Sequence, residues 1–179
     1  MTATTIKSDL VLAVEKGTVG STTERSYGQL KTLIDQDVIP TTSTDEADDA
    51  MMFGPIPSGA RIISIKALRD DIESAGDALT IDVGLAYSGL DGQQLSDKGK
   101  VSATIIDRDL FANELTTFRT AGTSYAELRF NNSDITTVTQ TVDELAGVTT
   151  GGSFYVSLQV GTAGGTEAQG DVVLRIDYI

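Results

Sequence analysis

Carboxylates are the side chains that this sequence groups most closely, so they are the first candidates for chemistry. Segment 44–49, TDEADD, places four carboxylates within five residues, and carboxylate oxygens are ligands that Ca²⁺ prefers. The segment lacks the glycine and the distal glutamate of a calcium-binding loop, and such runs are usually solvated loops. The same reasoning applies to Asp91 and Asp97. We therefore expect no metal site and no cofactor.

Paired carboxylates are a second chemical possibility, because two of them can hydrolyse a glycosidic bond. The available pairs are Asp107 with Asp109 and Glu114 with Glu127. A glycosidase cleft usually also carries aromatic platforms, but the chain has no Trp, and most of its five Tyr and five Phe fall on predicted core faces. A glycosidase is therefore not expected, and a lectin-like role is weakened without being removed.

Histidine and cysteine are both absent from the sequence. Their absence excludes Ser-His-Asp and Cys-His mechanisms, an imidazole general base, disulfides and zinc sites built on sulfur. No phosphate-binding fingerprint is present either, because Gly17, Gly20 and Gly28 lack the spacing and Gly164 lies between two predicted strands. We predict that the protein is not an enzyme.

Composition fits one β-rich domain of 179 residues and 18.8 kDa. The 18 glycines and the many threonines and serines favour strands joined by turns. A net charge of −13 should repel phosphate backbones and anionic lipid headgroups, so neither nucleic acid nor a membrane is an expected partner. No signal peptide or apolar run of about 20 residues is evident, so we expect a soluble chain.

The clearest structural signal is segment 48–70, DDAMMFGPIPSGARIISIKALRD, which reads as strand, corner, strand. Pro55 and Pro57 fix φ and remove ladder donors, and Gly59 can adopt the positive φ that a sharp turn needs. The alternation after the turn predicts a strand with one apolar face. The two alternating sets are Ile63, Ile65 and Ala67, and Ile62, Ser64 and Lys66.

Period-two alternation also predicts most of the remaining elements as strands. These strands span 27–39, 79–87, 101–106, 135–142, 153–160 and 171–179. In the first of these strands, Leu30, Thr32, Ile34 and Gln36 share one face. The alternative is a helix with an apolar face of Leu30, Leu33 and Ile34, but Pro40 would end such a helix early. We expect a hairpin connection over 161–170, GTAGGTEAQG, between the last two strands.

One short helix is predicted over 107–118, DRDLFANELTTF, with Asp107 as its cap. Its apolar stripe consists of Leu110, Phe111, Leu115 and Phe118. About eight strands without alternating helices predict an all-β fold, an antiparallel β-sandwich that is jelly-roll-like, with this one short helix.

Residues 1–26 are rich in Thr, Ser and Gly and form a predicted extended N-terminal arm, followed by the β-sandwich domain over 27–179. The arm carries one apolar patch, Leu10, Val11, Leu12, Ala13 and Val14. This patch could be an edge strand of its own domain or a segment that orders only against a neighbouring subunit. Leu10, Val11, Leu12 and Val14 are therefore the candidate interface residues.

The turn GPIPSGAR at 54–61, followed by an alternating strand, resembles a turn found in tailed-phage head decoration, or cement, proteins. The strands TIDVGLAY and GDVVLRIDYI follow in an order similar to that family's, so the resemblance covers about 27–179. It implies a virion structural protein, made in the host cytoplasm, that binds the outer surface of the major capsid protein shell. It also implies a homotrimer on local threefold axes.

The competing function within the virion is a head-fibre base or a receptor- or carbohydrate-binding β-domain, which would use its surface loops. A bacterial enzyme or a periplasmic binding protein is a third class, and the missing His, Cys, Trp and signal peptide argue against it.

Overall fold

A computed structural model describes residues 5–7, 29–39, 50–76, 78–89, 104–128, 139–148, 152–164 and 166–179. The strands are β1 (Thr5–Lys7), β2 (Lys31–Ile39), β3 (Ala50–Ile56), β4 (Ile62–Arg69), β5 (Glu73–Ala75), β6 (Thr80–Gly89), β7 (Thr104–Leu115), β8 (Ala126–Glu127), β9 (Gly152–Thr162), β10 (Thr166–Glu167) and β11 (Gly170–Tyr178). A 3₁₀-helix covers Thr117–Arg119, and the α-helix α2 covers Val142–Ala146.

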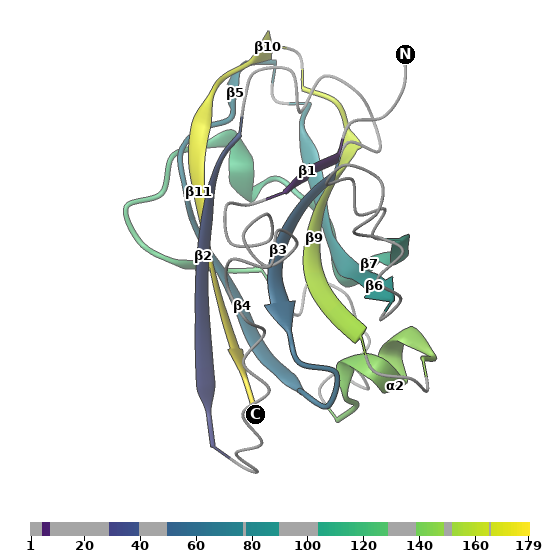
Figure 1. The fold of residues 1–179 in the computed structure, drawn as a ribbon. Coiled ribbons are helices and arrows are strands. Elements are labelled where there is room, and N and C mark those ends of the chain that lie inside the picture. Colours follow the sequence, from purple (N-terminus) through teal and green to yellow (C-terminus); the bar gives the residue numbers. More distant parts are fainter. Residues whose placement is uncertain are drawn as a thin grey trace.

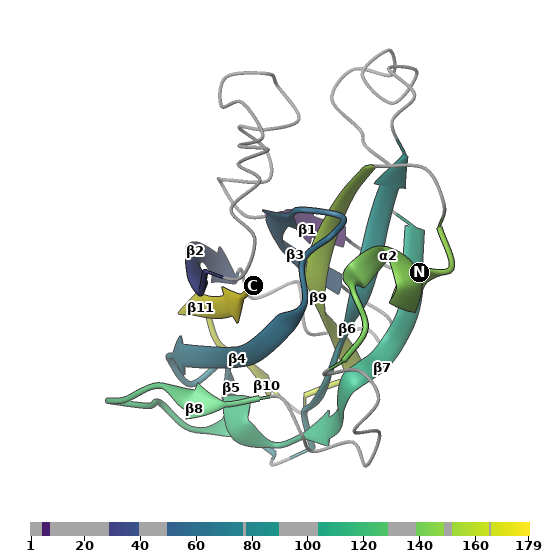
Figure 2. The same ribbon diagram turned by 90° about the horizontal axis from the view of Figure 1, so that it is seen from below.

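Two sheets face each other as the layers of a sandwich (Figures 1 and 2). One has the order β1-β3-β9-β6-β7, the other has the order β2-β11-β4-β8, and β5 pairs with β10. Among the described strands, all pairs are antiparallel except β1 with β3. Without β1, the five-stranded and four-stranded sheets contain eight strands that cross between the layers in the order of a jelly roll. The predicted all-β sandwich is confirmed.

The core lies between the sheets and consists of the apolar faces that alternation predicts. The buried residues on β9 are Phe154, Val156, Leu158 and Val160; on β11 they are Val172, Leu174 and Ile176; and on and just before β6 they are Leu79, Ile81, Val83 and Leu85. All of them have 0% exposure, and burying one such side chain is worth about 1.5–3 kcal/mol. Burial of these three faces closes the sandwich.

The predicted corner is present and carries the chain from β3 in one sheet to β4 in the other. The carbonyl groups of Ser58 and Ala60 accept hydrogen bonds from the Asp143 and Val142 N–H groups at 3.2 and 2.9 Å. The corner therefore satisfies free donors at the start of α2. The positive φ occurs at Gly54, with φ 151°, and not at Gly59 as expected, because the chain bulges within β3 before it turns.

A bulge also corrects the predicted face of β4. Ser64 lies opposite Asp177, but Ile62 lies opposite Tyr178, so Ile63 is an extra residue on β4. Ile62 is consequently buried together with Ile65 and Ala67, while Ile63 is half-exposed.

The helix predicted over 107–118 is wrong, because most of this segment belongs to β7 and only its end forms the 3₁₀-helix. Val83 pairs with Ala112, whereas Ile81 pairs with Leu115, so β7 has one residue more than β6 over this stretch. Glu114 has a φ of 52° within the stretch. Because of the bulge, Ala112 and Leu115 lie on the same face of the strand although they are three positions apart in sequence. A spacing of three is also that of an apolar stripe on a helix.

The strand predicted over 135–142 is also corrected. Residues 135–138 lie outside the described residues, and Val142 begins α2. Thr141 and Glu144 form a capping box in which the Thr141 N–H donates to Glu144 Oε2 at 2.9 Å. Gly147 ends the helix in the left-handed conformation, with φ 65°. These local signals are stronger than the short apolar alternation.

The connection over 161–170 does not form the expected hairpin between the last two strands, because β9 and β11 lie in different sheets. The connection instead crosses from one layer to the other and contributes β10, which pairs with β5.

Replacement of Gly84 tests how closely the bulged β7 lies over β6. A methyl group at Gly84 would overlap the backbone carbonyl groups of Asp107 and Arg108, whereas a methyl group at Gly59 would meet no atom within 4 Å. We expect Gly84→Ala to lower the free energy of unfolding by about 2 kcal/mol or more, because backbone must move. Urea unfolding measures this loss. Gly59→Ala is the matched control, expected to change stability by less than about 1 kcal/mol, and equal effects of the two variants would disprove the close approach.

Candidate interaction surface

The carboxylates singled out by sequence do not form a described catalytic or metal site. Segment 44–49, Asp91 and Asp97 lie outside the described residues. Glu114 is on β7 and Glu127 on β8, in different sheets. Among the residues that the structure describes, no three His, Cys, Asp or Glu side chains are grouped to hold a metal ion.

Asp107 and Asp109 do lie together on β7, where the Asp109 N–H donates to Asp107 Oδ1 at 3.3 Å. Burial, followed by the hydrogen bond to the Asp109 side chain and the charge of Asp109, raises the pKa of Asp107. The bonding between the two residues is local, as in an Asx turn.

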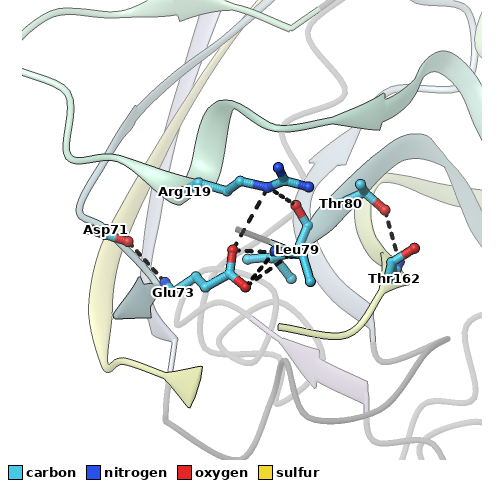
Figure 3. A network of polar contacts seen from close by, with 7 residues as sticks. Asp71, Glu73, Leu79, Thr80, Arg119 and Thr162 are labelled. Carbon is cyan, nitrogen blue, oxygen red and sulfur yellow. Dashed lines mark hydrogen bonds and ion pairs between the residues drawn. The ribbon is translucent and has the colours of Figure 1, made fainter. Parts of the chain in front are cut away.

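Glu73 is a buried carboxylate that accepts several hydrogen bonds, and Figure 3 shows its surroundings. Its two oxygens accept the Leu79 N–H at 3.1 Å, and Oε1 also accepts the Ala78 N–H at 2.9 Å. Arg119 Nε lies 3.7 Å from Glu73 Oε2 and donates to the Leu79 carbonyl at 2.6 Å. Glu73 thus joins the chain that enters β6 to the 3₁₀-helix, which is a structural role.

Asp82 has a comparable role on β6. Its carboxylate accepts hydrogen bonds from Arg108 Nε and from the Glu114 N–H, each at 2.8 Å. The same Arg108 donates from Nη2 to the Val160 carbonyl at 3.1 Å. The carboxylate therefore holds both bulged parts of β7 against the sheet.

Strand β2 is unusual because it carries a carboxylate, Asp35, on its core-facing side. Asp35 is buried, with 4% exposure, and its Oδ2 accepts the Gly54 N–H at 3.0 Å. Gly54 lies in the bulge of β3, in the opposite sheet. A buried N–H without an acceptor would destabilise the fold by about 1–3 kcal/mol. The hydrogen bond to Gly54 therefore explains why a carboxylate lies on the core side of β2.

The same arrangement places three large apolar residues on the outer face of β2 and just before it. Leu30, Ile34 and Val38 are 63%, 59% and 46% exposed, and we call them the β2 stripe. A register shifted by one residue would turn alternate side chains inward, and burial of each is worth about 1.5–3 kcal/mol. The folded chain forgoes this gain, so the β2 stripe is a candidate interaction surface.

Charged side chains of both signs lie beside the β2 stripe on the outer face of the four-stranded sheet. Asp177 accepts hydrogen bonds from Thr32 Oγ1 at 2.6 Å and from Arg175 Nε at 3.1 Å. On β4, Lys66 Nζ lies 3.9 Å from Glu127 Oε2. The chain carries a net charge of −13, but in this region each of these carboxylates lies beside a basic side chain.

A shallow hollow adjoins the same face, at the end of β4 and the start of β11. It has a volume of about 340 Å³ and is lined by Leu68, Arg69, Asp70, Gly122, Thr123, Asp171 and Val173. Val173 lies opposite Gln36 of β2 and Leu68 of β4. The outer face therefore has an apolar component beyond β2.

The predicted interface residues Leu10, Val11, Leu12 and Val14 lie outside the described residues. Within the predicted arm, Thr5–Lys7 forms β1 and pairs in parallel with Ala50–Met52 of β3. Alternation correctly placed Leu30, Thr32, Ile34 and Gln36 on one face, but it did not indicate that this face is the outer one. The inward carboxylate Asp35 was the available signal, and its partner Gly54 is distant in sequence.

The described part of the chain contains no helix long and apolar enough to cross a membrane.

Comparisons with known proteins find similarity in structure only. No protein-family model matches the sequence, and no curated protein matches it. The fold is similar to that of a chain in the capsid of Ralstonia phage GP4, with 18% identity, a TM-score of 0.65 and coverage of 98% of this chain and 97% of the other. It is also similar to a chain in the capsid asymmetric unit of cyanophage Pam1, with 20% identity, a TM-score of 0.50 and coverage of 88% and 90%. At these identities the likeness shows a shared fold.

The Asp177 contacts make stability depend on pH. Burial alone would raise the pKa of Asp177, but hydrogen bonds from Thr32 and Arg175 and the charges of Arg175 and Lys66 outweigh it, so the pKa is lowered. A carboxylate with a lowered folded pKa stabilises the fold above its unfolded pKa, about 3.9, and loses this contribution as the pH falls through the folded value.

We therefore expect Asp177→Asn to cost about 1 kcal/mol at neutral pH, and the difference from the unmodified protein should shrink below about pH 4. Urea unfolding across pH measures it. Asp171→Asn, at an exposed position of the same strand, is the control. A difference that stays constant down to about pH 2 would contradict this assignment.

Proposed function

We propose that this protein is a phage capsid decoration protein, which binds the outer surface of the major capsid protein shell and stabilises it. The observation that carries the proposal is the likeness, over nearly the whole of both chains, to a chain in the capsid of Ralstonia phage GP4. The turn GPIPSGAR at 54–61, which resembles the decoration family, supports the same assignment independently. In this role the protein acts mechanically and not as an enzyme.

The outer surface of the shell is the proposed location because of charge. A chain with a net charge of −13 would be repelled by packaged DNA, which carries a high density of phosphate charge. On the outside, the same charge would keep exposed domains soluble and limit unwanted association between particles. Many modest contacts to neighbouring capsid subunits would then add up by multivalency.

A homotrimer is the proposed assembly, because a threefold cluster lets each copy make the same contacts at a local threefold axis of the shell. Light scattering of the isolated protein should therefore give a mass three times the 18.8 kDa of one chain. A mass of 18.8 kDa at micromolar concentration would contradict a preassembled trimer.

Attachment is proposed to involve the apolar patch of the arm. The double variant Leu10→Asp/Leu12→Asp should bind undecorated capsids of the cognate phage about tenfold more weakly or worse, because loss of apolar burial costs at least about 1.4 kcal/mol. Co-sedimentation with capsids measures binding. The variant retains β1, which pairs with β3, so its melting temperature should stay within a few degrees of the unmodified value.

Thr22→Asp/Thr23→Asp adds the same charge to the arm without removing an apolar side chain, and it should bind like the unmodified protein. Failure of the unmodified protein to bind capsids would overturn the proposed function. Normal binding by Leu10→Asp/Leu12→Asp would show that the apolar patch of the arm does not contribute to attachment.

A further inference from the structure

Strand β2 ends the four-stranded sheet, and β11 is its only neighbour in the sheet of the described residues. It is nine residues long, and Thr32, Ile34, Gln36 and Val38 along it are all exposed. Edge strands of this length can pair with another strand unless charge, proline or a bulge prevents it. The described part of β2 has neither proline nor a bulge in its pairing with β11. It does carry charge, but Asp35 is bonded to Gly54 and Lys31 and Asp37 have opposite signs, so the edge is suited to a pairing that brings Lys31 and Asp37 together.

The sequence of β2 is complementary to itself when read in the opposite direction about Ile34. An antiparallel pair of two β2 strands with Ile34 opposite Ile34 places Leu30 opposite Val38 and Lys31 opposite Asp37. The apolar residues of the β2 stripe would then face one another across the pair, and both ends of the pair would bring opposite charges together. Such cross-strand pairs are the main side-chain contribution to sheet stability.

Neighbouring registers lose this match. A centre at Asp35 would place two buried carboxylates opposite each other, and like charges in directly opposite positions destabilise a pair. A centre at Leu33 would also bring opposite charges together, Lys31 with Asp35, but it would place Ile34 opposite Thr32 and would leave Val38 beyond the paired segment. The match of the apolar residues therefore selects the register centred at Ile34.

We propose that two copies of this chain associate through β2, antiparallel about a twofold axis at Ile34, so that their four-stranded sheets join into one continuous sheet. The contact is small, and two chains of net charge −13 repel each other, so it is weak in dilute solution and becomes stronger as salt screens the repulsion. On a shell, it would join neighbouring threefold clusters across local twofold axes; this use alone rests on the proposed function.

Cysteine cross-linking tests the register directly, because the sequence has no cysteine of its own. Residues directly opposite in an antiparallel pair have Cα atoms about 4.5–5.5 Å apart, within the range of about 4.4–6.8 Å that a disulfide spans. In the proposed register Ile34→Cys faces its own copy. Thr32→Cys is a matched exposed control on the same face, but its copy lies four residues further along, about 13 Å away.

Under mild oxidation at high protein and salt concentration, we expect Ile34→Cys to form covalent dimers at least about tenfold faster than Thr32→Cys. Thr32→Cys mixed with Gln36→Cys should also cross-link quickly, because these positions face each other. Equal rates for Ile34→Cys and Thr32→Cys would overturn the proposal, since they would indicate random collision.

The charge pair provides a second test in the Ile34→Cys background. Lys31→Glu alone and Asp37→Lys alone should each slow cross-linking several-fold, and the double variant should restore the rate because the pair is then reversed. A restored cross-linking rate would show that the two residues pair between copies, because damage to the fold by the single substitutions would not be repaired by combining them. If the double variant is as slow as the single variants, although its melting temperature is unchanged, Lys31 and Asp37 do not face each other and the register is wrong.

These experiments use the isolated protein, so they are independent of capsid binding. Fast Ile34→Cys cross-linking without co-sedimentation on capsids would keep the twofold contact and remove the proposed function. Co-sedimentation with capsids without preferential cross-linking of Ile34→Cys would keep the proposed function and overturn the twofold contact.

Discussion

The hydrogen bond from the Gly54 N–H to Asp35, made on the same side of β2 that buries Ile39, fixes which side of the strand faces the core. It joins the edge strand of one sheet to the bulge of the other at 3.0 Å, in a buried position. Strand side chains alternate, so fixing Asp35 inward also fixes Ile34 and Val38 outward. The apolar stripe is thus the outer side of a strand whose inner side satisfies a buried backbone donor and buries Ile39. Turning the stripe inward would turn Asp35 and Ile39 outward and leave the Gly54 donor without this acceptor.

Bulges explain both the shape of the sandwich and most differences from the sequence predictions. The apolar core faces of β6, β9 and β11 follow from period two alone, although the opposite faces of β6 and β9, with Ala86 and Tyr155, are buried as well. Strand β7 carries extra residues opposite β6, so its apolar spacing resembles that of a helix although it pairs as a strand. A bulge depends on a partner strand that is distant in sequence, so local periodicity cannot reveal it.

The candidate surface could be predicted only in part, for the same reason. Alternation placed Leu30 and Ile34 on one face of β2, but contacts made by the opposite face decide that this one is outer: Asp35 bonds to Gly54, which is 19 residues away, and Ile39 is buried in the core. The helix α2 is a different case, because the capping box of Thr141 and Glu144 and the terminal Gly147 are local signals that sequence alone contains. The arm patch at Leu10–Val14 stays a prediction from composition.

The proposed role of this jelly roll is that of a decoration protein on the outside of a phage capsid. A cryo-EM reconstruction of particles assembled by the cognate phage, compared with particles that lack this protein, tests it most directly. We expect additional jelly-roll density on the outer surface, with copies clustered at local threefold axes. Density inside the shell, at the tail only, or no difference between the two particles would contradict it.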